Sequence, residues 1–183
     1  MKRAAVLLSD GFEEVEGLTQ VDFLRRSGLD VSVLGVTGTQ VTGGHDIRIE
    51  TDMRIEEASG SFDAVVIPGG MPGAQHVADS KAAASLIKEV FDEGELVAAI
   101  CAAPAVVLEP LGVLKGKKAT CFPGFEGRLE SCSFVEQRVV RDGKVITSRG
   151  PGTAAEFAVS IIEFLLGKEK AEEVRSQTLT ILH

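Results

Sequence analysis

The chain has 183 residues, of which 44% are hydrophobic and 25% charged, and it carries a formal net charge of −8 at pH 7. This length suits one α/β domain with a substantial core. The acidic balance argues against nucleic acid and anionic membrane surfaces as partners, since both require clustered cations. No apolar run approaches the ~20 residues of a membrane span. The apolar run after Met1 is too short for a signal peptide, so we expect a cytoplasmic protein.

Strand-like and helix-like segments alternate in the first half of the chain. In chain order, the pattern predicts a strand at Arg3–Leu8, a helix at Glu14–Ser27, a strand at Val31–Val36, a short side strand or hairpin around Ile47, Ile49 and Thr51, a strand at Phe62–Ile67, a helix at Lys81–Asp92 and a strand at Leu96–Ile100. Gly28 should end the first helix, and Asp79 or Ser80 should cap the second.

The second half continues the alternation with less regular spacing. The pattern predicts a helix at Ala105–Leu111, a short strand at Ala119–Phe122, strands at Phe134–Val140 and Lys144–Ser148 on either side of an Asp142-Gly143 turn, an apolar helix at Thr153–Leu166 and a charged helix at Lys168–Gln177. No internal repeat and no long linker interrupts the sequence, so residues 1–183 are predicted to form a single domain.

This alternation predicts the fold class. Apolar strands separated by helices indicate an α/β, doubly wound parallel sheet that is covered by helices on both faces. Ligands of such sheets bind beyond the C-terminal strand ends, at the switch point in strand order. Three loops leave such ends, at Ser9–Glu16, Pro68–Gly73 and Cys101–Pro104, and a functional site is expected where they converge.

Cys101 lies at the end of the apolar run Leu96-Val-Ala-Ala-Ile-Cys-Ala-Ala-Pro104, where a strand runs into a helix start. Helix N–H groups and the positive end of the helix dipole favour a thiolate, so we expect the Cys101 pKa to be depressed. Nucleophile elbows expose a serine by the same strand–turn–helix arrangement. The alternative is a small, inert residue buried at a strand end.

Glu16 is the second candidate. In Asp10-Gly-Phe-Glu-Glu-Val-Glu16, Glu13 and Glu14 are typical of the acidic first turn of a helix. Glu16 lies further into that helix and is placed to point toward the sheet edge. There it would exchange a proton with Cys101, whereas the alternative is a helix-start acid like its neighbours.

The glycine-rich segment Pro68-Gly-Gly-Met-Pro-Gly73 follows a strand. Its N–H groups, together with the amide after Cys101, could form an oxyanion hole, or its glycines could simply allow a tight turn. It lacks the spacing of a phosphate-binding loop. The segment Ser148-Arg-Gly-Pro-Gly-Thr153 is either a structural turn or a pocket wall.

Cysteine and histidine spacing argues against metals and disulfides. The three cysteines (Cys101, Cys121 and Cys132) are an odd number without a C-x-x-C pair, and the three histidines (His45, His76 and His183) form no metal-binding motif. The sequence therefore predicts no metal site, no disulfide framework and no cofactor.

The motifs together resemble the ThiJ/PfpI superfamily, and within it the branch of the Parkinson-linked protein deglycase. The resemblance rests on Ala98-Ala-Ile-Cys-Ala-Ala-Pro104, the acidic Asp10–Glu16 segment, Val66-Ile-Pro-Gly-Gly70 and Thr147-Ser-Arg-Gly-Pro-Gly-Thr153, in this order along nearly the whole chain. It implies a flavodoxin-like homodimer in which Cys101 is the reactive, oxidisable thiol and Glu16 its hydrogen-bonded partner. It further implies that the backbone of Gly69, Gly70 and Ala102 lines the oxyanion region.

The resemblance implies cofactor-free conversion of methylglyoxal to lactate, or repair of early glycation adducts, with a small aldehyde or glycated substrate. Two positions depart from the family pattern, because Ala102 and Phe122 stand where relatives carry histidines. A first alternative is an oxidative-stress sensor or chaperone that uses oxidation of Cys101. A second is an intracellular cysteine peptidase or amidase, against which the missing histidines argue.

Overall fold

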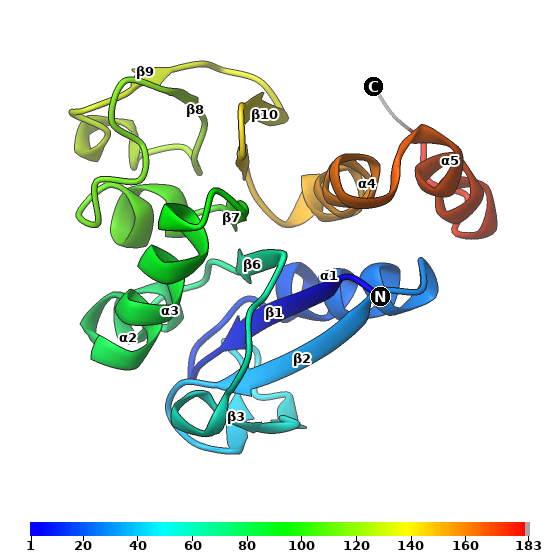
Figure 1. The fold of residues 1–183 in the computed structure, drawn as a ribbon. Helices are drawn as coiled ribbons and strands as arrows, with labels where there is room; N and C mark the ends of the chain where they lie inside the picture. Colours follow the sequence, from blue (N-terminus) through cyan, green and yellow to red (C-terminus); the bar gives the residue numbers. More distant parts are fainter. Residues whose placement is uncertain (182–183) are drawn as a thin grey trace.

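A mostly parallel sheet of seven strands forms the centre of the computed structural model, which describes residues 1–181 (Figure 1). The strand order across this sheet is β10, β11, β7, β6, β1, β2 and β5. The bounds are Val139–Asp142 (β10), Val145–Ser148 (β11), Leu96–Ile100 (β7), Ala64–Ile67 (β6), Arg3–Leu8 (β1), Asp30–Gly35 (β2) and Met53–Arg54 (β5). The β10–β11 hairpin is antiparallel, and the other neighbouring pairs of this sheet are parallel. Without the edge strands β5 and β10, the order is the flavodoxin-like 2-1-3-4-5.

Helices cover both faces of the sheet, as the apolar strands require. Strands β6 and β7 are buried along their whole length, so both of their faces need a cover. One face carries α1 (Glu14–Arg26) and α4 (Ala154–Leu166), with α5 (Lys168–Gln177) packed outside α4, and the other carries α2 (Gly73–Asp79) and α3 (Lys81–Asp92) (Figure 1). The fold class predicted from the sequence is therefore confirmed.

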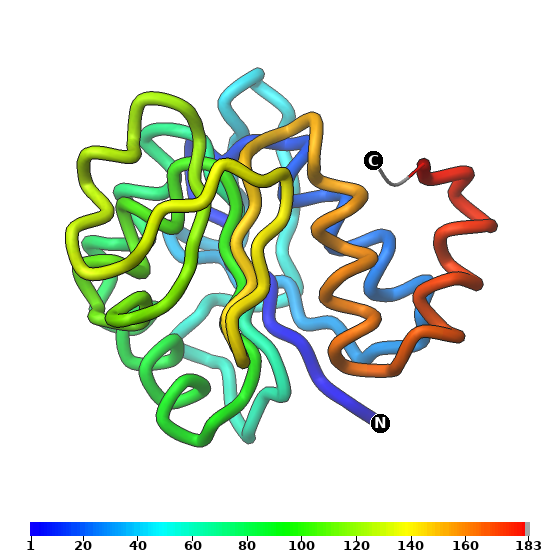
Figure 2. Tube along the Cα trace, turned by 90° about the horizontal axis from the view of Figure 1, so that it is seen from above, coloured from blue at the N-terminus to red at the C-terminus, as the bar shows by residue number. Residues whose placement is uncertain are grey.

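The remaining elements are short. They are the antiparallel hairpin of β3 (Gln40–Thr42) and β4 (Arg48–Glu50), the parallel pair β8 (Lys118–Ala119) and β9 (Ser133–Phe134), the 3₁₀ turns η1 (Ile55–Glu57), η3 (Glu126–Arg128) and η4 (Pro151–Thr153), and the π-helical turn η2 (Pro104–Leu108). The loop-rich segment between β7 and β10 lies on the opposite side of the molecule from α5 (Figure 2). Over residues 1–181, no helix is long and apolar enough to cross a membrane.

Several predicted elements need correction. The helix expected at Ala105–Leu111 is the π-helical turn η2 followed by hydrogen-bonded turns. The single strand expected at Phe134–Val140 is divided between β9 and β10. Helix α2 was missed because the sequence Pro68–Gly73 reads as a loop, although Gly73 already begins the helix. Of the two cap candidates for α3, Ser80 is the cap, since its Oγ accepts the Ala83 N–H at 3.2 Å. His183 lies outside the described residues.

Candidate functional site

The three loops singled out in the sequence converge at the C-terminal edge of the sheet. Glu16 follows β1, Gly69 follows β6 and Cys101 follows β7, so the site lies beside the β1–β6 switch point of the strand order. A methyl group added to Gly69 would lie 2.5 Å from Cys101 Cβ and 2.8 Å from Glu16 Oε2. Because Gly69 has no side chain, the Cys101 thiol and the Glu16 carboxyl can both pack closely against its backbone.

Cys101 has the backbone conformation of a nucleophile elbow. Its φ is +65°, in the left-handed region that costs a side-chain-bearing residue roughly 1–2 kcal/mol. Two backbone hydrogen bonds hold it there, because its N–H donates to Ser148 O at 2.9 Å and its carbonyl accepts the Phe122 N–H at 2.8 Å. The residue is 9% exposed. The strained turn thus turns the sulfur out of the strand while keeping it largely out of water.

Glu16 is fully buried and points inward, as the sequence predicted for a partner of Cys101. Its Oε2 accepts the Gly69 N–H at 2.8 Å. Its Oε1 has no partner of regular hydrogen-bond geometry among the described residues. Burial raises the pKa of Glu16 to about 7, against the opposing effects of the Gly69 N–H and the Cys101 thiol. A carboxyl group with this pKa both takes up and releases a proton near neutral pH.

The expected depression of the Cys101 pKa is contradicted. Burial and the charge of the Glu16 carboxylate raise the pKa of Cys101 to about 12, although the N–H groups of Gly70 and Ala102 act in the opposite direction. The helix start is visible in the sequence, whereas the burial of the sulfur and the nearby Glu16 carboxylate arise only in the folded chain. Thiolate and carboxylate repel each other in this space, so the pair favours states in which at least one of the two groups holds a proton.

The backbone N–H groups predicted to line the oxyanion region have two different roles. The N–H groups of Gly70 and Ala102 face the sulfur, where an oxyanion would develop next to it. Gly69 also lies against Cys101, but its N–H is already donated to Glu16. Gly70 has a φ of +85°, and a side chain there would collide with the backbone of Phe12 and Glu13.

A cavity of about 230 Å³ opens at the segment between β11 and α4, and neither Cys101 nor Glu16 is among its lining residues. Phe122, Arg149 and Gly150 line it, together with Pro123, Arg138, Pro151, Gly152 and Thr153. One lining residue, Phe122, is joined to the elbow, since it donates its N–H to the Cys101 carbonyl at 2.8 Å. Within the segment Ser148–Thr153, residues 149–153 therefore form both a structural turn and a pocket wall. A larger hollow of about 480 Å³ is lined by the β3–β4 hairpin and not by the site residues.

Fold and site define a class of α/β protein in which a flavodoxin-like sheet presents a cysteine on a strained elbow next to a buried acid. The sequence profile of the DJ-1/PfpI family matches residues 2–164. The chain belongs to the DJ-1/PfpI family.

Known relatives agree with this assignment. The chain is 43% identical over 94% of its length to Protein DJ-1 homolog B of Arabidopsis thaliana, and it spans only 40% of that longer relative. It is 44% identical to Protein dj-1beta of Drosophila melanogaster, with 94% of both chains covered. It is 34% identical to the glutathione-independent glyoxalase DJR-1.2 of Caenorhabditis elegans, again with 94% of both covered.

Solved structures show the same fold. The crystal structure of Drosophila melanogaster DJ-1beta matches with a TM-score of 0.95 at 43% identity over 99% of both chains. The structure of oxidized Toxoplasma gondii DJ-1 matches with a TM-score of 0.94 at 36% identity over the whole of both chains.

Proposed function

We propose that this protein is a cofactor-free enzyme that detoxifies reactive carbonyl compounds, with Cys101 as nucleophile and Glu16 as the proton carrier. One observation carries the proposal. The buried Glu16 carboxyl, with its pKa near 7, lies across Gly69 from a cysteine held at positive φ. The name of the Caenorhabditis elegans relative, a glutathione-independent glyoxalase, supports this choice of chemistry.

The proposed mechanism can be followed with methylglyoxal as the substrate. The Cys101 sulfur bonds to the aldehyde carbon while the thiol proton moves to Glu16, and the N–H groups of Gly70 and Ala102 bind the resulting oxyanion. Glu16 then gives the thiol proton to this oxygen, removes the hydrogen of the former aldehyde carbon as a proton and returns it to the neighbouring carbon, while the hydroxyl proton moves from the first oxygen to the second to leave a lactoyl thioester. The aldehyde carbon is thereby oxidised and the ketone carbon reduced, within one molecule. Water then cleaves the thioester to lactate and restores the thiol.

Lactate formation from methylglyoxal tests the proposal. Cys101→Ser should abolish turnover, and Glu16→Gln should lower kcat/KM by about 10²–10⁴-fold, the usual value of general acid–base help. The matched controls are Cys132→Ser and Glu50→Gln, which change a half-buried cysteine and an exposed acid away from the pair. Full activity in Cys101→Ser or Glu16→Gln would overturn the proposed mechanism.

The alternative functions predict different results in the same assay. A stress sensor or chaperone that uses Cys101 oxidation needs no substrate-dependent turnover. Absence of lactate formation by the wild-type protein would therefore favour this function. A peptidase needs a base such as histidine, and the position where relatives carry one holds Phe122, which is 40% exposed. We also propose a cytoplasmic homodimer, as the family resemblance implies, which sedimentation velocity and cell fractionation would test.

A further inference from the structure

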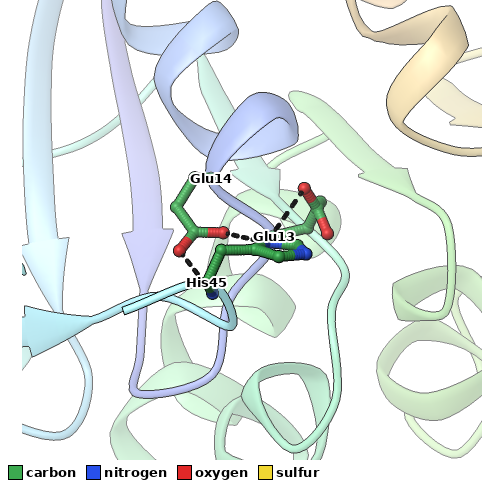
Figure 3. Close-up of side chains that lie close together, drawn as sticks. All are labelled: Glu13, Glu14 and His45. Carbon is green, nitrogen blue, oxygen red and sulfur yellow. Dashed lines mark hydrogen bonds and ion pairs between the residues drawn. The ribbon is translucent and has the colours of Figure 1, made fainter. Parts of the chain in front are cut away.

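Three side chains outside the Cys101 site converge on one point of the surface. Glu13 and Glu14 stand at the start of α1, and His45 stands in the turn of the β3–β4 hairpin (Figure 3). His45 Nδ1 lies 2.8 Å from Glu14 Oε2 and 3.8 Å from Glu13 Oε1. Each residue offers one ligand atom, and these three atoms all lie within 4.8 Å of one another.

Glu14 is held in place before any ligand arrives. Its side chain is only 5% exposed, and its Oε1 accepts the His45 N–H at 2.7 Å. This bond fixes the carboxylate so that Oε2 faces the imidazole, as outer hydrogen bonds commonly orient a metal ligand. Gly43 lies directly over the same carboxylate, where any side chain would collide with it. The backbone of the hairpin turn thus packs closely against the Glu14 carboxylate.

Glu13 contributes a second carboxylate next to Glu14. Its side chain is 18% exposed, yet among residues 1–181 no donor forms a hydrogen bond with its carboxylate. The cation-capable group next to it is the His45 imidazole, at the 3.8 Å already given. Two carboxylates therefore share one imidazole. The imidazole side chain is 70% exposed, so the cluster is open to solvent on that side and can adjust around an incoming ion.

We propose that Glu13, Glu14 and His45 form a binding site for a divalent transition-metal ion of the Zn²⁺ type. One imidazole nitrogen and two carboxylate oxygens are the mixed set that Zn²⁺ accepts, whereas Mg²⁺ and Ca²⁺ prefer oxygen ligands alone. The exposed side leaves a coordination position for water. A bound ion would join the hairpin to the helix that carries Glu16, since Glu14 and His45 are separated by 31 positions in the sequence.

The probe is ZnCl₂, titrated calorimetrically into the full chain, with MgCl₂ in a parallel titration. We expect one Zn²⁺ per chain, no matching Mg²⁺ binding, and a thermal midpoint that Zn²⁺ raises and chelator restores. Glu13→Gln and His45→Ala should each weaken Zn²⁺ binding at least about tenfold and remove the thermal shift.

Two control variants separate this site from other Zn²⁺ ligands. Cys101→Ser removes the reactive thiol and should leave the affinity unchanged. His76→Gln alters a histidine whose Nδ1 instead contacts Asp10 O at 2.8 Å, and it should also bind normally. Circular dichroism of each variant confirms folding. Unchanged Zn²⁺ affinity in folded His45→Ala, or loss of binding in Cys101→Ser, would overturn the proposal.

Discussion

Glu16→Gln should stabilise the folded protein at alkaline pH while it removes activity. Glutamine keeps the size of the side chain and an oxygen that can accept the Gly69 N–H, a bond of 2.8 Å in the wild type. It removes a carboxyl group whose pKa burial raises from 4.5 to about 7. The substitution thus changes ionisation with little change in packing.

The size of the effect follows from linkage. In the unfolded chain the carboxyl loses its proton near pH 4.5, whereas in the folded protein it keeps the proton until about pH 7. Between these values the folded state binds more protons, so wild-type stability falls as pH rises, and this loss is complete above the folded pKa. At 1.36 kcal/mol per unit, a shift of about 2.5 units corresponds to about 3 kcal/mol. Glu16→Gln has no ionisable group at this position, so its stability does not fall in this way as pH rises.

Urea unfolding at pH 5 and pH 8 measures the effect. The stability of Glu16→Gln relative to wild type should rise by about 2–3 kcal/mol between the two pH values. Glu50→Gln, at an exposed position of β4, should show no comparable trend. A difference between Glu16→Gln and wild type that is the same at pH 5 and pH 8 would show that Glu16 is not a strained, buried acid, and the reasoning would fail.

Three further outcomes follow from the geometry. Gly69→Ala should abolish lactate formation, because its methyl group would lie 2.5 Å from Cys101 Cβ, whereas Gly152→Ala, with no atom within 4 Å, should retain activity; steady-state kinetics of both decide this. The free energy of unfolding of Cys101→Gly should exceed that of Cys101→Ala by roughly 1 kcal/mol, since only glycine adopts a φ of +65° without strain. Urea unfolding measures it, and equal midpoints would contradict the strained elbow. Mild peroxide should add two oxygens selectively to Cys101, because no sequence motif pairs Cys121 or Cys132 with it to resolve a sulfenate and a protonated Glu16 can hydrogen-bond a sulfinate oxygen; peptide mass mapping that finds a disulfide to either residue as the main product would refute this.

The sequence by itself determined the fold class and the three loops of the site. Continuous apolar runs such as Leu96–Ile100 are buried on both sides, and local composition is enough to show this. Strand ends in a parallel sheet meet at one edge, so the convergence of Glu16, Gly69 and Cys101 followed from the order of elements. The irregular region after Cys101 did not follow, since the π-helical turn Pro104–Leu108 depends on packing rather than on periodicity.

Only the tertiary structure decided the proton affinities. The helix start after Cys101 is visible in the sequence and predicts a lowered pKa, but the burial of the sulfur and the carboxylate of Glu16 are contributed by other segments. Likewise, the meeting of His45 with Glu13 and Glu14 depends on how the β3–β4 hairpin docks on α1. Desolvation and charge interactions are set by distances in space, and residues 16, 69 and 101, like residues 14 and 45, become neighbours only when the chain is folded.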